Sequence, residues 1–219
     1  MKKRDLILIT LVVCGVLFSC NREVVLNYSG DIMIDLGSTD KNVLAYVSAS
    51  DGSEVSVSGI DYELVGEQIA TFTVGDKNEK KSVKIKSDKL TGMYEISIFL
   101  MDGDKEYKLT SGKWLMEITK GSQYNQINIP DTTEKGTSIF IDAGALVVTF
   151  NGKDSATIPS FIGDFNFCFE TSYWSFSNIV YGPIGKGDYA IKGFLMKENP
   201  VGSNYEYYYR VQLDKQSSL

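Results

Sequence analysis

The sequence predicts an all-β protein made of two β-sandwich-like domains, and three observations support this fold class. Segments in which apolar and polar residues alternate recur along the chain, as expected for strands with one buried face. Clusters of Gly, Asp, Asn and Ser interrupt these segments about every ten residues, a spacing typical of sandwiches. No segment shows the apolar period of an amphipathic helix.

The first domain is expected to span residues 20–120. A block of this length with this turn spacing predicts an immunoglobulin-like sandwich. Alternation is clear where Ala70, Phe72 and Val74 fall on one side of their strand. The expected strands are residues 24–28, 31–36, 43–49, 54–58, 69–74, 82–86, 94–100 and 113–118.

A polar stretch, residues 121–136, contains Pro130 and Gly136 and is expected to be a linker. The second domain, residues 137–219, is richer in aromatic side chains. Of the chain's 13 Tyr, 11 Phe and 2 Trp, 16 follow residue 130, which predicts an aromatic-rich β domain. Its expected strands are residues 139–150, 164–170, 173–181, 189–197 and 205–214, the last two joined by a turn that contains Pro200 and Gly202.

The first 19 residues have the layout of a bacterial export signal, with basic residues followed by a short apolar run. Residues 17–20, Leu-Phe-Ser-Cys, resemble the lipobox of bacterial lipoproteins. This resemblance implies that cleavage leaves Cys20 as a lipidated first residue, which holds the protein on a membrane rather than across it. Cys14 is a rival, although Val13 suits the cut poorly, and a secretory peptide or an uncleaved anchor is the remaining alternative.

The composition excludes several classes of function. Without residues 1–19 the chain keeps 19 basic and 27 acidic residues, so its net charge is −8 and nucleic acid is not an expected partner. The chain has no histidine, which removes zinc sites, Ser-His-Asp triads and Cys-His pairs. Only Cys168 would remain unmodified, so no internal disulfide is expected, and its aromatic neighbours predict a buried, inert thiol.

Residues 59–100, GIDYELVGEQIATFTVGDKNEKKSVKIKSDKLTGMYEISIFL, carry a family resemblance. Together with the lipobox, this pattern of strands and turns resembles the N-terminal sandwich of surface lipoproteins from Bacteroidetes polysaccharide-utilisation systems, over residues 31–118. The resemblance implies an outer-membrane, lipid-anchored protein at the cell surface whose C-terminal part binds glycan. Thr132 and Ser155 lie in short sequences that resemble O-glycosylation sites of exported Bacteroidetes proteins.

The candidate ligand-binding residues are large aromatics near serines. Alternation places Trp174 on one face of its strand and Tyr173 on the other, beside a turn. Such rings can stack on the apolar face of a sugar while hydroxyls and amides orient it. Trp174 also fits a core position, so Tyr173, Tyr181 and Tyr208 are the better surface candidates.

The same alternation sorts the tyrosines near the C-terminus. Tyr205, Tyr207 and Tyr209 share a face with Val211 and Leu213, which predicts that these three tyrosines pack in the core. Tyr205 or Tyr207 could still turn a hydroxyl outward at the open end of the strand. Tyr208 is expected to face solvent.

These observations predict a non-catalytic protein that binds or presents polysaccharide. The alternative is a structural or adhesin-like subunit that binds an outer-membrane protein through a sheet edge. An enzyme is not expected, because Asp164 and Glu170 lie about 20 Å apart along one strand, too far for a glycosidase pair. The acidic turns at residues 51–54 and 102–106 fit hairpins better than calcium loops, so no metal or other cofactor is expected.

Overall fold

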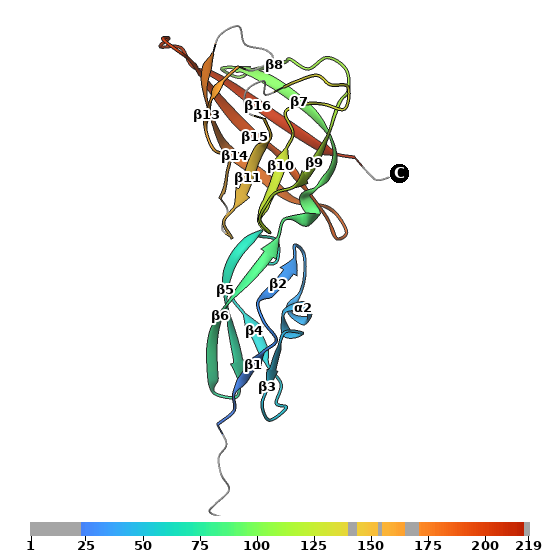
Figure 1. Cartoon of the computed structure of the whole chain (residues 1–219), viewed down its shortest axis with the longest axis vertical. Coiled ribbons are helices and arrows are strands. Elements are labelled where there is room, and N and C mark those ends of the chain that lie inside the picture. The colour runs from blue at the N-terminus through green and yellow to red at the C-terminus, as the bar shows by residue number, and fades with distance from the viewer. Residues whose placement is uncertain (1–22, 140–143, 153–154, 165–170, 217–219) are drawn as a thin grey trace, which may run out of the picture.

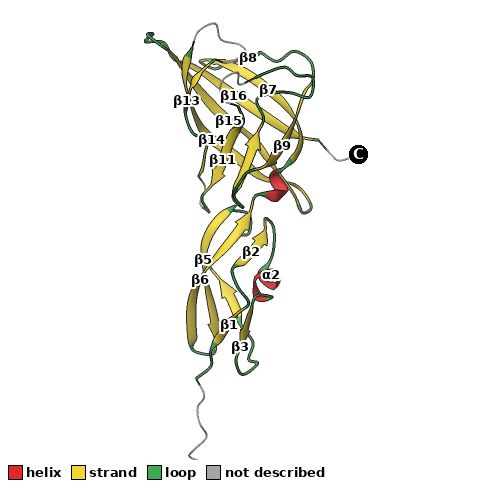
Figure 2. Cartoon of the chain, viewed as in Figure 1, coloured by secondary structure: helices red, strands yellow, loops and turns green. Residues whose placement is uncertain are grey.

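The computed structural model describes residues 23–139, 144–152, 155–164 and 171–216. Strands dominate this part of the chain, as Figure 2 shows, which confirms the all-β, sandwich-like fold. The predicted strand at residues 164–170 lies largely outside the described residues, as do Cys14, Cys20 and Cys168.

The first unit is a small sandwich of two sheets. One sheet pairs β1 (Leu26–Tyr28) with β3 (Val47–Ala49). The other has the order β2 (Ile32–Asp35), β6 (Lys77–Lys86), β5 (Gly66–Val74) and β4 (Ser56–Ser58), with β2 parallel to β6. The rings of Tyr28 and Phe72 meet edge to face at 5.6 Å and join the two sheets.

A short helix, α2 (Asp40–Leu44), replaces the start of the strand expected at residues 43–49. Its N-terminus is capped through Asn42, whose side-chain oxygen accepts hydrogen bonds from the Thr39 backbone N–H and hydroxyl. Val43 turns into the core and is fully buried. A helix of little more than one turn is too short to show an apolar period, which explains why the sequence did not predict it.

The second unit is one curled antiparallel sheet with the path β12-β11-β10-β9-β7-β16-β15-β14-β13, and β8 extends the β9 edge of β7. The ends of this path approach each other, because β12 contacts β14. The sheet therefore curls around its own core, as Figure 1 shows. Its strands are β7 (Gly92–Asp102), β8 (Lys105–Lys108), β9 (Trp114–Lys120), β10 (Gln126–Ile129), β11 (Leu146–Phe150), β12 (Ala156–Thr157), β13 (Phe161–Gly163), β14 (Ser172–Gly185), β15 (Asp188–Pro200) and β16 (Tyr207–Lys215).

The strand pairing places the boundary between the two units earlier in the chain than the sequence predicted. β7 pairs with β16 from Tyr94–Lys215 to Met101–Tyr208, so residues 92–120 belong to the second sheet rather than to the first sandwich. The first unit ends with β6, and a 3₁₀ turn (Asp88–Leu90) leads into the second. The expected linker, residues 121–136, instead contains β10. Alternation identified β7, β9 and β16 but not β10, and it could not identify which strands pair with one another.

The two units meet through a close backbone contact. The Gly152 N–H donates to the Val65 carbonyl at 2.9 Å, and the Val65 N–H donates to the Tyr181 hydroxyl at 3.1 Å. A Cβ on Gly66 would lie 2.1 Å from the Gly152 nitrogen, so only glycine fits there. In Figure 1 the units lie end to end, with β1 near the end of the first unit that faces away from the second.

Candidate ligand-binding face

Trp174 is a core residue. Its side chain is 1% exposed, and its indole N–H donates to the Gly163 carbonyl at 3.0 Å. Its ring stacks with that of Phe161 and packs against Tyr209 at 5.9 Å between centroids. Because β14 curls with this face inward, the Trp174 ring is not presented on the surface, which argues against the prediction that Trp174 binds ligand.

Tyr181 lies at the contact between the two units. Its hydroxyl accepts the hydrogen bond from Val65, and its ring meets Phe150 edge to face at 4.9 Å. Both ends of the side chain are therefore used in holding the second unit against the first. This position argues for a structural role and separates Tyr181 from the other surface candidates.

Tyr173 and Tyr208 share the outer face of the curled sheet. Tyr173 on β14 pairs with Asn199 on β15, and Tyr208 on β16 pairs with Lys197 on β15. The two tyrosines are 52% and 44% exposed and flank β15 from opposite sides. Two strand spacings and a two-residue offset put their Cα atoms about 12 Å apart.

Polar groups lie between these two rings. Glu206 accepts hydrogen bonds from the Lys197 ammonium at 2.6 Å, the Tyr208 hydroxyl at 2.7 Å and the Asn199 amide at 3.3 Å. The Lys197 bond, followed by those from Tyr208 and Asn199, lowers the pKa of Glu206 to about 2. The Lys197 ammonium also lies 5.9 Å from the centre of the Tyr208 ring. The carboxylate and the ammonium therefore neutralise each other on this face.

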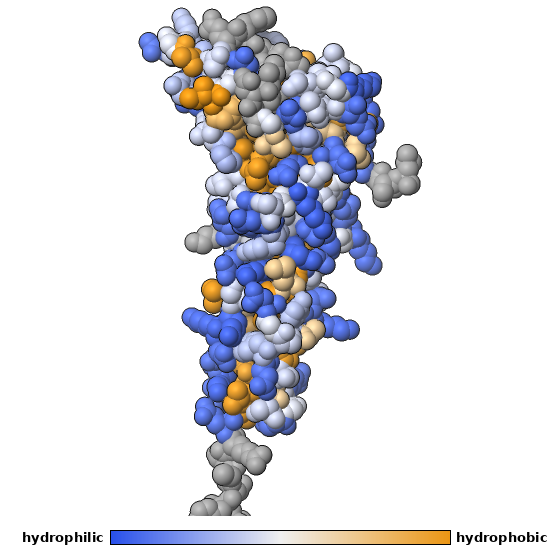
Figure 3. Space-filling model, in the orientation of Figure 1, coloured by the Kyte–Doolittle hydropathy of each residue, from blue (hydrophilic) through white to orange (hydrophobic). Residues whose placement is uncertain are grey.

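A hollow of about 420 Å³ adjoins Tyr173. It is lined by Ser160, Phe161, Ile162, Tyr173, Trp174, Ser175 and Asn199. Ile162 is 57% exposed and lies directly opposite Tyr173 on β13. Figure 3 shows hydrophobic residues gathered near β13 at this end of the second unit. The hollow thus combines an exposed ring and an aliphatic side chain with hydroxyls and an amide.

A buried carboxylate supports this face from behind. Glu198 is 4% exposed and accepts hydrogen bonds from the Ser172 hydroxyl at 2.8 Å and the Tyr209 hydroxyl at 2.6 Å. These bonds tie β14, β15 and β16 together on the inner side. The strands that carry Tyr173 and Tyr208 are therefore held together by hydrogen bonds on the inner face of the sheet.

The other tyrosines near the C-terminus divide between core and surface. Tyr209 is buried with Val211 and Leu213, as alternation predicted. Tyr205 and Tyr207 are 73% and 44% exposed, so their assignment to the core is wrong. Tyr205 precedes β16, which begins at Tyr207, and both residues lie at the open end of the curled sheet beyond its packed interior.

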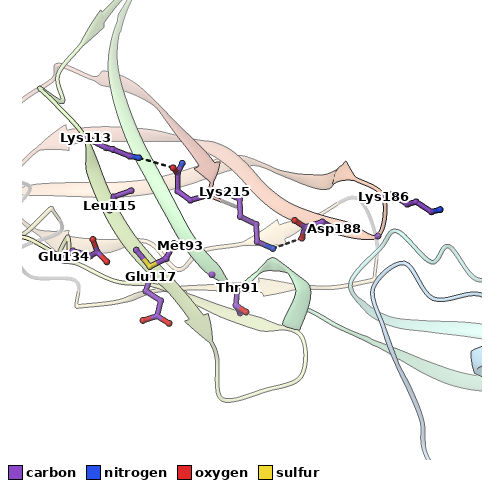
Figure 4. A pocket seen from close by; sticks show the side chains of 12 residues that line it. Thr91, Met93, Lys113, Leu115, Glu117, Glu134, Lys186, Asp188 and Lys215 are labelled. Carbon is purple, nitrogen blue, oxygen red and sulfur yellow. Dashed lines mark hydrogen bonds and ion pairs between the residues drawn. The ribbon is translucent and has the colours of Figure 1, made fainter. Parts of the chain in front are cut away.

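A larger hollow of about 1090 Å³ lies at the other end of the second unit, beside β7, β9 and the β14–β15 turn (Figure 4). It contains an ion pair and a hydrogen bond from a charged side chain. Lys215 contacts Asp188 at 2.9 Å, and Lys113 lies 3.2 Å from Gln216. Figure 4 shows the Lys186 side chain pointing away from the rest. Because the hollow is wide, lacks an aromatic ring in its lining and mixes both charges, it favours no ligand class.

Comparisons of the chain with protein-family models, with curated proteins and with solved structures find no match. The resemblance to Bacteroidetes lipoproteins therefore stays a prediction from the sequence. No helix among the described residues is long and apolar enough to cross a membrane. Within those same residues, no three acidic or cysteine side chains gather as a metal site would require.

The sequence did not reveal Asn199, Glu206 or Ile162 as parts of this face. Asn199 and Glu206 flank the β15–β16 turn, and they meet only because Lys197 pairs with Tyr208. Ile162 comes from a strand of three residues at the edge of the sheet. The sequence did not show the pairing register of these hairpins. That register determines which polar side chains lie beside the two tyrosines.

Proposed function

We propose that the protein is a non-catalytic, lipid-anchored surface protein that binds glycan through the outer face of β14, β15 and β16. The observation that carries this proposal is the pair of exposed tyrosines, Tyr173 and Tyr208, with Asn199, Lys197 and Glu206 between them. Flat rings match the apolar faces of sugars, and the amide and charged groups match their hydroxyls.

The openness of this face supports a polymer rather than a small molecule. Both tyrosines lie on the outside of the sheet, and the hollow beside Tyr173 is open to solvent. A carbohydrate polymer can pass over such a surface and contribute contacts from several units. A small ligand would instead need a concave site that buries most of its surface.

The proposed anchor fits this placement of the face. Lipidation at Cys20 would leave two residues, Asn21 and Arg22, before the described chain begins at Glu23. The first unit would then lie close to the membrane, and the Tyr173 face would project beyond it, since the units lie end to end (Figure 1). We propose the outer membrane as the location.

Native gels cast with a panel of polysaccharides test the function. We expect at least one polysaccharide to retard the protein, and Tyr173→Ala or Tyr208→Ala to reduce the retardation without changing the unfolding midpoint. Tyr107→Ala is the matched control, because Tyr107 is 48% exposed and pairs with Leu100, which lies on the inner face beside the buried Tyr209. It should migrate like the unmodified protein.

Two results would contradict the proposal. One is the absence of retardation by every polysaccharide in the panel. The other is equal loss of binding in the Tyr107 variant and the two face variants. Recovery of an outer-membrane protein by cross-linking, with no glycan bound, would favour the adhesin-like alternative instead.

A further inference from the structure

The outer face of β15 carries a second hollow, of about 320 Å³, farther along the same strand. It is lined by Asn178, Val180, Lys192, Gly193, Phe194, Leu195, Arg210 and Val211. Gly193 supplies no side chain here, and Val180, its partner on β14, is 51% exposed. The hollow therefore has an apolar floor on the outside of the sheet.

A bulge in β14 shapes this second hollow. Ser177 pairs with Leu195, whereas the next pair is Val180 with Gly193, so β14 contains an extra residue between these pairs. Asn178 absorbs the irregularity with a φ of 49°, a left-handed conformation that asparagine tolerates better than most residues. The bulge brings Val180 onto the outer face beside Gly193.

The two hollows lie along one line. Asn199, Lys197, Leu195 and Gly193 alternate on the outer side of β15, since Glu198, Met196 and Phe194 are buried on the inner side. Six residues of strand separate Asn199 from Gly193, which corresponds to about 20 Å. An occupant that fills both hollows must therefore be elongated.

Two of the cations along this line are already paired. Arg210 makes two hydrogen bonds to Glu106, at 2.8 and 2.6 Å. Lys197 is paired with Glu206 at 2.6 Å. An acidic polymer would therefore meet Lys192 at the far hollow but neither of these two cations. The net charge of −8 that the chain keeps without residues 1–19 would also repel it. The balance of charge favours an uncharged occupant.

We infer that the ligand is an uncharged glycan chain of several sugar units that lies along the outer face of β15, from the Tyr173 hollow to the Gly193 hollow. This inference rests on the proposed function and adds the length, direction and charge of the ligand. One end of the chain stacks on the two tyrosines, and the other end contacts Val180 and Leu195.

Calorimetric titration with a neutral oligosaccharide series tests the inference. The probes are disaccharide to hexasaccharide fractions from the neutral polysaccharide that most retards the protein in the gels, with polygalacturonate as the acidic comparison. We expect affinity to rise about tenfold or more with chain length. Val180→Glu should remove this gain for long chains and leave the shortest binding chain unaffected. Ile184→Glu is the control, because Ile184 is 47% exposed on the same strand and does not line the hollow.

The outcomes separate the inference from the function on which it rests. Affinity independent of chain length, or unchanged by Val180→Glu, would overturn the extended path while leaving glycan binding intact. Polygalacturonate binding as tightly as the neutral chains at physiological salt would overturn the uncharged ligand. Retardation by no polysaccharide at all would overturn both proposals.

Discussion

Replacing Gly152 with alanine should weaken the contact between the two units. Gly152 has a φ of 68°, and a Cβ there would lie 2.2 Å from the Glu67 carbonyl oxygen. The left-handed conformation alone costs alanine about 1–2 kcal/mol. The overlap is with backbone, so no rotamer change relieves it, and we expect about 1–3 kcal/mol more from the forced shift. Loss of the Gly152–Val65 hydrogen bond adds about 1 kcal/mol.

Gly144→Ala provides the matched control for this prediction. Gly144 precedes β11, as Gly152 follows it, and has a φ of 61°, but a Cβ added to Gly144 would have no atom within 4 Å. It should show only the conformational cost, so Gly152→Ala should lower the free energy of unfolding by about 2–4 kcal/mol more.

Urea unfolding followed by tryptophan fluorescence measures this difference. Both tryptophans, Trp114 and Trp174, lie in the second unit, so the signal follows the unit that contains both substituted glycines. Equal destabilisation by the two alanine variants would refute the reasoning, because it would mean that the backbone of Gly152 does not meet that of Glu67.

Two further predictions concern stability. Lys215→Met should lower the free energy of unfolding by about 2–4 kcal/mol in urea, because the ammonium, in a side chain only 13% exposed, donates to two backbone carbonyls and to Asp188. The Lys215 bond lowers the pKa of Asp188, so this stabilisation is fully present above the unfolded pKa of about 4 and is lost as the pH falls through the lower folded pKa. The variant should lose less stability on acidification than the unmodified protein, and parallel pH profiles would contradict this. Trp174→Phe should cost about 2–4 kcal/mol yet leave retardation by polysaccharide unchanged, whereas lost binding in a folded variant would return Trp174 to the binding site.

The positions of strands could be predicted from the alternation of apolar and polar residues, but the pairing of strands within the sheets could not. The strands at residues 173–181 and 189–197 were predicted, and the structure extends each at both ends. The partner of β7 was not predictable, because β16 lies more than a hundred residues later and any of several alternating strands would match its pattern. The boundary between the domains depends on that pairing. It therefore lies before β7 rather than at residue 120, where it was expected.

The residues of the candidate site were likewise predictable only as far as alternation along each strand could place them. Alternation correctly put Tyr173 opposite Trp174 across β14 and turned Tyr208 away from Tyr209. It could not decide which face of β14 curls inward, and so Trp174 remained a candidate for binding. It also treated Tyr205 as part of β16, although burial ends where the strand passes the edge of the packed core.

A hydroxyl that is hydrogen-bonded inside the protein identifies a tyrosine with a structural role. Tyr94 is fully buried, donates to the Leu90 carbonyl at 2.7 Å and has its pKa raised by burial. Tyr181 and Tyr209 likewise use their hydroxyls inside the protein. Within the described part of the chain the Tyr173 hydroxyl makes no hydrogen bond, and its ring is half exposed beside a hollow. Such a ring gives the folded chain little stability, since neither its hydroxyl nor much of its surface is used. An exposed ring beside a hollow is what the proposed contact between Tyr173 and a glycan requires.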